Sequence, residues 1–436
     1  MKIILAATPA AGHFNPVLAT GRILLAAGHE IIFTTGSAFR GQVESIGGRF
    51  VPLPRYADLD LSDIDDTFPE RRTLPPGLAR LRFDMERIFV DTIPDQYAGL
   101  CAVLEDFPAD LILGDDVFAG ALPLLLGARA DRPAIAALGV TFLLLHRDDG
   151  APPSVGLPPA TEAKQIAEYQ HLMDATDAAL FNPLRERIDR ILLSLGARPL
   201  PMSFFDALVS LPDCYLHPSP PEFEYPRCDL PGSVRFIGSL PPPPGYELPR
   251  EIAAVLRVGK RIVLVTQGTV ANFDLGELVA PTLTALADRN DVIVLVATGG
   301  RRVTDIPGGL PANAHAAMFL PFDLIMEHID VLVTNGGYGT VTSALSHGVP
   351  VVVAGMTEDK PEVGARVAWS GTGIDLRTER PTAAQLREAI DAALNDAKYR
   401  DRADAMAAAF GRHDAAHDIN SLLAAAVSFR QAASKA

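Results

Sequence analysis

The chain has 436 residues and a formal net charge of −15, from 38 Lys and Arg against 53 Asp and Glu. Apolar types make up 48% and charged types 21%, so the chain can bury the cores of two or three domains without disulfides or metals. The acidic balance opposes nonspecific binding to nucleic acids or anionic lipids, because both require a basic face. We therefore expect no nucleic-acid partner.

The three cysteines are widely spaced and form no CxxC pair, which indicates neither a disulfide framework nor a zinc site. The first apolar run is soon interrupted by Pro9 and Gly12, so it is too short for a signal peptide. The longest apolar stretch, 133–145, is too short to span a bilayer. These features predict a cytoplasmic chain without a membrane span.

The first half opens with the alternation of strand and helix that is typical of parallel sheets. Residues 2–7 predict a buried strand, Asn15 and Pro16 the start of a helix that ends at Gly28, and residues 30–35 a second strand. This is a βαβ unit. Further buried strands are predicted at 110–114 and 133–138, residues 55–80 read as an irregular surface excursion, and 151–205 as mainly helical.

Four consecutive prolines at 241–244 predict a stiff connector, because proline fits neither helix interiors nor sheet interiors. After it the alternation restarts. The expected strands are 261–266, 292–297, 316–320, 331–334 and 350–354, and the expected helices are roughly 274–288, 322–328, 339–347, 361–370 and 382–396. The fold class is therefore α/β, with two Rossmann-like doubly wound domains facing a cleft. The predicted parts are a first domain at 1–237, a linker at 238–250, a second domain at 251–414 and a final segment at 415–436.

A glycine-rich turn, Asn335-Gly-Gly-Tyr-Gly-Thr340, follows the predicted strand 331–334 and precedes a helix. Such a turn lets a ligand approach the backbone, and the helix N-terminus offers free N–H groups to a phosphate. The alternative is a merely tight turn. A second turn, 266–269, follows a strand of the same domain, and two turns at neighbouring strand ends favour the phosphate interpretation.

His13 lies in the predicted turn between the first strand and the first helix, where the helix dipole should keep its imidazole neutral and able to accept a proton. Asp115 and Asp116 follow another strand of the same domain. Either carboxylate can hold one ring nitrogen and stabilise the imidazolium formed on proton transfer. A solvated or capping histidine is the plainer alternative.

Two patterns imitate metal sites. The acidic pairs Asp58/Asp60 and Asp63/Asp65 match a DxD motif, and the histidines at 413 and 417 imitate HExxH. The acidic pairs sit in a strandless stretch, and the histidine pattern has Asp in place of Glu and no third ligand. We therefore predict no metal and no cofactor.

With these residues in hand, the sequence resembles the family 1 glycosyltransferases, the UDP-glycosyltransferase-like enzymes with the GT-B fold. The resemblance rests on Gly12–Pro16 (GHxxP), on the strand 110–115, and on residues 313–373. The last stretch is similar to the family's HxGxG[ST]…AL…GVP…DQ…ARV…GxG signature, with its spacing kept. The resemblance covers nearly the whole chain.

The resemblance implies that the first domain binds the acceptor, the second binds the nucleotide sugar, and the last helix crosses back to the first domain. It makes His13 the general base and Asp115 its partner, with Asp116 as the fallback, and it assigns the diphosphate to Gly337, Gly339 and Thr340 and sugar hydroxyls to Asp359. The other donor-binding candidates are Gly12, Gly268, Thr269, Phe319, Leu320, Asn335, Tyr338 and Lys360.

Three positions depart from the family pattern. Asn335 replaces the usual phosphate-binding His, Lys360 replaces the Gln after the sugar-binding Asp, and Ser343 replaces the acidic ribose-binding residue of plant members. These changes leave open whether the donor carries UDP, which we favour, or dTDP.

The sequence therefore predicts an inverting, metal-independent O-glycosyltransferase, with glucose favoured, acting on a small apolar acceptor. The acceptor segments are expected at 55–95 and 140–180, where Phe68, Phe83, Phe89, Phe142 and 143–145 either line a pocket or belong to the core. A nucleotide-sugar epimerase and a non-catalytic auxiliary protein are the rival interpretations. The sequence does not indicate the oligomeric state.

Overall fold

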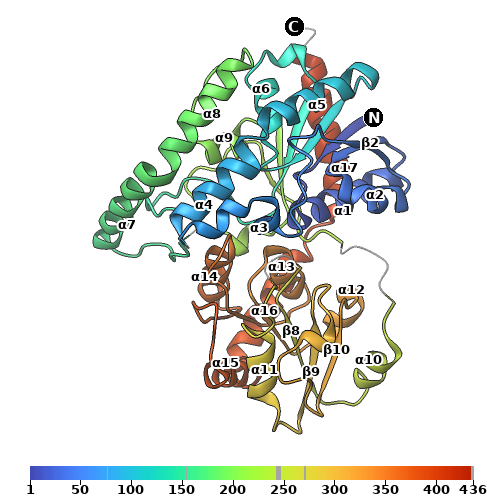
Figure 1. Ribbon diagram of the computed structural model, residues 1–436, viewed down its shortest axis with the longest axis vertical. Coiled ribbons are helices and arrows are strands. Elements are labelled where there is room, and N and C mark those ends of the chain that lie inside the picture. The colour runs from blue at the N-terminus through green and yellow to red at the C-terminus, as the bar shows by residue number, and fades with distance from the viewer. Residues whose placement is uncertain (76, 154, 242–246, 270–271, 434–436) are drawn as a thin grey trace.

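The computed structural model describes residues 1–75, 77–153, 155–241, 247–269 and 272–433. It contains two parallel β-sheets, each with helices on its faces, which lie one above the other in Figure 1. The sheets have seven and six strands. This is the predicted α/β architecture of two Rossmann-like domains.

The sheet of the amino-terminal domain has the strand order β3-β2-β1-β4-β5-β6-β7, with every pair parallel. Its strands are β1 (Lys2–Ala6), β2 (Glu30–Thr35), β3 (Arg49–Pro52), β4 (Leu111–Asp115), β5 (Ala134–Leu138), β6 (Cys214–His217) and β7 (Val234–Phe236). The central strands are continuous apolar runs because helices cover both faces of the sheet. Ile3 and Leu5 enter one buried cluster and Ile4 enters another, on the opposite face.

The sheet of the carboxy-terminal domain has the order β10-β9-β8-β11-β12-β13, again all parallel. Its strands are β8 (Arg261–Thr266), β9 (Val292–Ala297), β10 (Ala314–Ala317), β11 (Val331–Thr334), β12 (Val351–Val353) and β13 (Gly373–Asp375). The predicted strand 316–320 is placed too late in the sequence, since β10 is Ala314–Ala317. It begins earlier, and residues 318–320 lie in the loop that follows.

Helices connect the strands of both sheets. They are α1 (Ala11–Ala26), α2 (Arg40–Ser45), α3 (Ile64–Thr67), α4 (Leu78–Asp84), α5 (Ile93–Asp106), α6 (Leu122–Leu125), α7 (Ala163–Thr176), α8 (Asn182–Ser194), α9 (Phe204–Ser210), α10 (Arg250–Val255), α11 (Val279–Leu286), α12 (Phe322–Ile325), α13 (Tyr338–Ser346), α14 (Lys360–Ser370), α15 (Ala383–Asn395), α16 (Ala397–Phe410) and α17 (Ala415–Ala433). The predicted helix 274–288 is shorter at both ends, and α16 was not predicted at all.

The start of the first helix differs from the prediction. Helix α1 begins at Ala11, and Pro16 lies inside it rather than at its first turn. Ala10 occupies the N-cap without a side-chain hydrogen bond, so Asn15 does not cap the helix. Pro16 is the sixth residue of α1 and has no N–H to donate to the Gly12 carbonyl, so the helix lacks one internal hydrogen bond there. The earlier helix start places His13 within the first helical turn.

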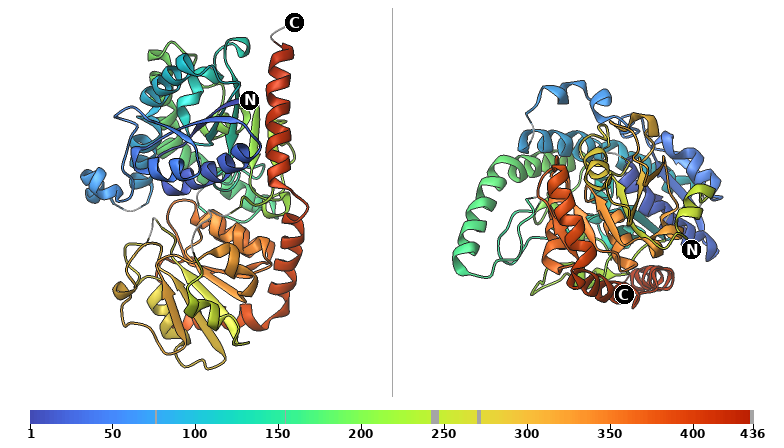
Figure 2. Two further views of the ribbon diagram at one scale, coloured as in Figure 1. Left: turned by 90° about the vertical axis from the view of Figure 1, so that its right-hand side faces the viewer. Right: turned by 90° about the horizontal axis from the view of Figure 1, so that it is seen from below.

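The final helix returns the chain to the first domain. Figure 2 shows α17 running along the amino-terminal domain, and it contacts α1, β5 and β6 there. Its apolar residues Ile419 and Leu423 are fully buried in the same cluster as Leu5 and Leu113. Of the predicted proline connector, residues 242–244 lie outside the described residues. Within the described ranges, no helix is long and apolar enough to cross a membrane.

The contact between α1 and its sheet has no room for a side chain at Gly21. A Cβ there would lie 2.3 Å from Phe33 Cζ and 2.7 Å from Leu5 Cδ1. We therefore expect Gly21→Ala to lower the free energy of unfolding by about 1–3 kcal/mol through overpacking. Gly41→Ala in α2 is the matched control, since a Cβ there meets nothing within 4 Å. Urea denaturation should show destabilisation for Gly21→Ala only; equal midpoints for both variants would contradict the packing.

Candidate active site

His13 forms a hydrogen-bonded pair with a carboxylate at the end of a neighbouring strand. Its Nδ1 lies 3.1 Å from Asp115 Oδ1. The His13 side chain is 22% exposed and that of Asp115 is fully buried. A ring nitrogen that faces a carboxylate carries the hydrogen, so Nε2 keeps a free lone pair. The pair therefore has the arrangement of a general base with its orienting acid.

Asp115 is held by the loop that follows β1. The backbone N–H of Thr8 donates to Oδ2 at 2.6 Å and the Thr8 hydroxyl donates to Oδ1 at 3.2 Å. The backbone N–H of Val117 adds a third donor at 3.3 Å. The parallel pairing of β1 with β4 sets Ala6 opposite Gly114, so both strands end at this place. Three donors fix the carboxylate before any substrate binds.

Asp116 does not contact His13 but accepts a hydrogen bond from the Tyr215 hydroxyl at 2.8 Å. Burial and the adjacent Asp115 charge raise the pKa of Asp116 to about 7, although Tyr215 and His13 act in the opposite direction. The geometry therefore selects Asp115 as the partner of His13. Asp116 lies behind the pair as a buried, partly protonated carboxyl group.

The pKa of His13 is raised above its ordinary value. Burial lowers it, but the hydrogen bond and charge of Asp115, with the charges of Asp116 and Asp359, outweigh that effect. The expectation that the helix dipole keeps the imidazole neutral is therefore wrong in direction. Three carboxylates near the ring have a stronger influence than the partial charge at the helix end.

The two glycine-containing turns of the carboxy-terminal domain lie side by side. Strands β8 and β11 are paired with Thr266 opposite Thr334, and the Asn335 side-chain amide donates to the Gln267 carbonyl oxygen at 2.6 Å. Gly336 has φ of 99°, and a Cβ there would lie 2.7 Å from Val353. Only glycine fits this position, so the turn has one tight shape.

Open space adjoins the first turn of α13. A Cβ at Gly337 or Gly339 would meet nothing within 4 Å, and the same holds for Gly12 in α1. The N–H groups of Tyr338 and Gly339, the first two residues of α13, precede the first complete turn and have no intrahelical acceptors. Small residues, free space and N–H donors together form the kind of site that binds phosphate. Thr340 lies in the same turn, and its own N–H donates to the Gly337 carbonyl at 3.1 Å.

The remaining donor candidates lie around these turns. Gly268 has φ of 72° and Thr269 is exposed beside it. Phe319 is 38% exposed in the loop after β10, close to Gly300. Leu320 is different, because its side chain is buried in the core and leaves only its backbone available to a ligand.

Asp359 lies immediately before α14 and links the two domains. Its Oδ2 accepts a hydrogen bond of 2.6 Å from the hydroxyl of Thr141, in the loop after β5. Burial raises the pKa of Asp359, and the Lys360 charge and the Thr141 hydrogen bond oppose that rise. The sequence analysis missed Thr141. The one feature of the sequence that could have indicated Thr141 is its hydroxyl group three residues after the predicted buried strand 133–138.

Lys360 is the first residue of α14, and its side chain is only 5% exposed. Its amino group pairs with the carboxylate of Glu358 and lies 3.3 Å from the Thr357 hydroxyl. Glu358 has φ of 57°, a left-handed conformation that is uncommon for a residue with a side chain. The cation is therefore held beside Asp359 by a strained turn.

The acidic pairs that imitate a metal motif have structural roles. Asp58 accepts from the Ser37 backbone and hydroxyl, Asp60 from both donors of Ser62, and Asp63 caps α3. The histidine at 413 lies 3.7 Å from Asp418. Across the described residues, no group of three or more His, Cys, Asp or Glu side chains is placed to hold a metal ion.

The apolar segments of the first domain divide between core and site. Phe142 and residues 143–145 are buried in the core that connects the two domains. Phe89 is only partly buried, and its ring centroid lies 5.6 Å from that of His13. Phe68 and Phe83 contact each other edge to face at 5.9 Å. Phe89 is therefore the aromatic side chain that adjoins the base.

Known proteins are similar to this chain in sequence and in fold. Residues 281–421 match the family described as "Erythromycin biosynthesis protein CIII-like, C-terminal domain". The chain is 35% identical to 4'-demethylrebeccamycin synthase of Lentzea aerocolonigenes, covering 97% of this chain and 98% of that protein. It is 34% identical to UDP-glucosyltransferase A1 of Starmerella bombicola, in a match that covers 92% of this chain and 86% of that protein. The chain belongs to the family 1 glycosyltransferases.

The crystal structure of a calicheamicin glycosyltransferase has the same fold as this glycosyltransferase, with a TM-score of 0.72 at 21% identity over 97% and 98% of the two chains. The match to residues 281–421 includes the turn at 335–340 and helix α14. His13 and Asp115 lie outside residues 281–421, and the geometry of this pair comes from the structure of this chain alone.

The buried carboxyl group of Asp116 should make stability depend on pH. A pKa raised to about 7 means that the folded state holds this proton more tightly than the unfolded state. The stability that the protonated Asp116 side chain contributes is therefore present near pH 4 and is lost as pH rises through 7. We expect Asp116→Asn, which keeps an oxygen acceptor for Tyr215, to remove this loss and to be more stable relative to wild type at pH 8 than at pH 4.

The measurement is urea denaturation of wild type and Asp116→Asn at pH 4, 6 and 8. The difference in unfolding free energy should change by a few kcal/mol, on the order of 1.4 kcal/mol per pKa unit. Asp229→Asn is the control, since that residue is exposed. A difference between Asp116→Asn and wild type that stays constant with pH would contradict the raised pKa.

Proposed function

We propose that this glycosyltransferase transfers a hexose from a nucleotide diphosphate sugar to a hydroxyl group of a small apolar acceptor, with inversion. The observation that carries the proposal is the His13–Asp115 pair, in which Nδ1 faces the carboxylate, the His13 side chain is 22% exposed, and the Asp359 charge of the second domain acts on the ring. UDP-glucose is the favoured donor, since a relative at 34% identity is named a UDP-glucosyltransferase. The alternative donor nucleotide is dTDP.

In the proposed reaction, His13 Nε2 takes the proton of the acceptor hydroxyl. The acceptor oxygen then attacks the anomeric carbon while the bond from that carbon to the diphosphate oxygen breaks on the opposite face. The electron pair of that bond leaves with the nucleotide diphosphate. Asp115 stabilises the imidazolium through the Nδ1 hydrogen bond of 3.1 Å.

The leaving diphosphate gains negative charge as the bond breaks. We assign its stabilisation to the N–H groups at the start of α13, flanked by Gly337 and Gly339, and to the hydroxyls of Thr340 and Thr269. Donors fixed in advance lower the barrier because they need not reorganise during the reaction. In this proposal the helix end does the work that a metal ion does in other transferases.

Asp359 is proposed to accept hydrogen bonds from sugar hydroxyls. Its carboxylate lies between the Thr141 hydroxyl and the buried Lys360, at the boundary of the two domains. Phe89, beside His13, is proposed to contact the acceptor, and an apolar acceptor fits an aromatic ring at that position.

Replacing His13 tests the assigned base. We expect His13→Ala to lower kcat by about 10²–10⁴-fold, the usual contribution of a general base, while the Kd for UDP stays unchanged. Activity with a panel of phenolic and alcoholic acceptors, and calorimetry with UDP, provide the two measurements. Turnover that persists in a folded His13→Ala enzyme would remove the residue from the mechanism.

The hydrogen-bonded pair of His13 and Asp115 also predicts how kcat/KM depends on pH. The pKa of His13 is raised by Asp115, and the base acts only when neutral, so kcat/KM should fall as pH drops through that raised pKa. Asp115→Asn removes the charge and should move this acid limb to lower pH while also lowering kcat. An acid limb at the same pH in both enzymes would contradict the pairing.

A thermal-shift panel of UDP-, dTDP- and GDP-sugars tests the donor. A ligand that binds only the native state stabilises it by mass action, by about 2.7 kcal/mol when the ligand is at 100 times its Kd. This added stability raises Tm. UDP-glucose should give the largest shift. A panel in which no nucleotide sugar moves Tm would contradict the proposed donor site.

A further inference from the structure

The phenol of Tyr338 crosses from the second domain into the first. Tyr338 is the first residue of α13 and lies between Gly337 and Gly339. Its hydroxyl oxygen is 3.2 Å from Nε2 of His217, the last residue of β6 in the amino-terminal domain. Tyr338 is 4% exposed and His217 is fully buried. The turn proposed to bind the diphosphate is thus attached to the opposite domain.

His217 is itself held by a carboxylate of its own domain. Its Nε2 lies 3.0 Å from Glu224 Oε1. A carboxylate accepts hydrogen bonds, so Nε2 carries a hydrogen for Glu224 Oε1, and the phenol oxygen is a second acceptor within reach of that hydrogen. Nδ1 is buried and has no hydrogen-bond partner among the described residues, so the ring is held through Nε2.

Glu224 in turn reaches back to the second domain. Its Oε2 accepts from Arg366 of α14 at 3.0 Å, and Arg366 also donates to Glu362 at 2.8 Å. Burial raises the pKa of Glu224, but Arg366 and His217 reverse this and lower it to about 2, so the carboxylate is ionised. A buried ion pair of this kind is weak in net stability but strict in geometry.

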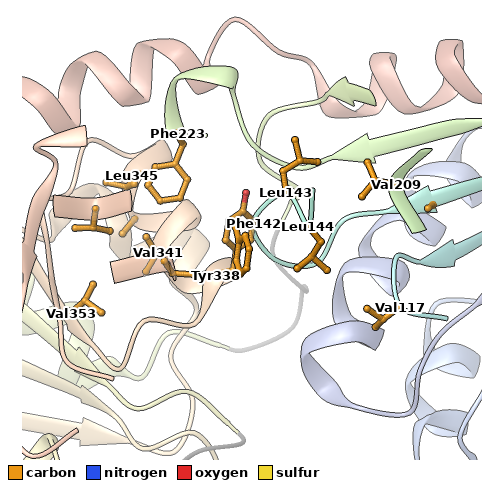
Figure 3. Packing of buried hydrophobic residues seen from close by; sticks show 14 of the residues in the cluster. Val117, Phe142, Leu143, Leu144, Val209, Phe223, Tyr338, Val341, Leu345 and Val353 are labelled. Carbon is orange, nitrogen blue, oxygen red and sulfur yellow. The ribbon is translucent and has the colours of Figure 1, made fainter. Parts of the chain in front are cut away.

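Aromatic rings enclose this chain of polar groups. The Tyr338 ring lies 6.0 Å from His217 and 6.2 Å from Phe223, and the Arg366 guanidinium lies 4.6 Å from the Phe142 ring. Figure 3 shows Phe142, Phe223 and Tyr338 among the buried side chains where the two domains meet. Because these groups are buried, they depend on their hydrogen-bond partners, and Tyr338 and Glu224 each have one in the opposite domain.

We propose that His217 is a positioning residue for the donor: held by Glu224, it fixes the Tyr338 phenol and thereby the first turn of α13 that receives the diphosphate. This inference rests on the proposed function, since it names what holds the donor turn in place. Gly336 gives the turn its tight shape, and the anchored Tyr338 ring adds the contact that ties this turn to the first domain. A residue of the acceptor domain therefore sets the affinity for the donor.

The primary test compares two Tyr→Phe variants at the same interface. Tyr338→Phe keeps the buried ring and removes the hydroxyl that contacts His217. Tyr225→Phe is the matched control, because the Tyr225 hydroxyl is buried without a hydrogen-bond partner in the described structure and its ring packs on the same Arg366. We expect Tyr338→Phe to raise the Kd for UDP roughly fivefold, the effect of one lost hydrogen bond, and Tyr225→Phe to leave it unchanged.

Variants of His217 separate positioning from general loosening. His217→Leu should also raise the Kd for UDP, and the double variant with Tyr338→Phe should be no weaker than Tyr338→Phe alone, because His217 acts through the phenol, which also contacts Ser219. His217→Gln keeps an N–H donor at the position of Nε2 and should restore part of the affinity. The acceptor KM should stay constant throughout, because the acceptor is proposed to bind beside His13 and Phe89 and not at the interface of His217 with Tyr338.

Equal UDP affinities for wild type and Tyr338→Phe, with wild type binding UDP and turning over, would overturn the positioning role and leave the proposed function intact. A parallel rise in the UDP Kd and the acceptor KM would overturn it as well, since that pattern indicates a loosened fold. A wild-type protein that binds no nucleotide diphosphate and releases none would overturn the proposed function and this inference together.

Discussion

The parallel pairing of β1 with β4 is the constraint on which the candidate active site depends. It ends both strands at one edge of the sheet, so the Thr8 loop and Asp115 meet there and the first turn of α1 presents His13 to the same carboxylate. The second domain repeats the device with β8 and β11, whose following turns hold each other through Asn335. Each half of the proposed reaction thus rests on a pair of neighbouring parallel strands.

The two halves share polar contacts across their boundary in addition to a common apolar core. Thr141 donates to Asp359, and the chain of contacts Tyr338–His217–Glu224–Arg366 crosses the domain boundary twice. Such buried groups cost free energy when unpaired, so a change in relative domain position breaks several bonds at once. Domain geometry and donor-site geometry are therefore linked.

Acidity and anion binding are compatible in this protein. The net charge of −15 excludes a broad basic surface, but an N-terminal helix turn with open space beside Gly337 and Gly339 needs no such surface. The same acidity acts at the candidate site, where Asp115 and Asp116 of the first domain and Asp359 of the second raise the pKa of His13. The proposed base is thus stronger than an isolated imidazole.

Local patterns in the sequence determined the α/β class, the central strands, the glycine turn at 335–340 and the candidate pair of His13 with one of two aspartates. These follow from short-range rules: apolar runs, glycine conformations and strand ends. The tertiary structure alone selected Asp115 over Asp116, assigned Phe142 to the core and Phe89 to the site, and reversed the expected direction of the His13 pKa. It also revealed Thr141, His217 and Glu224 as partners of residues more than a hundred positions away. Sequence spacing carries no information about such contacts, because they form only when two separately folded sheets are packed against each other.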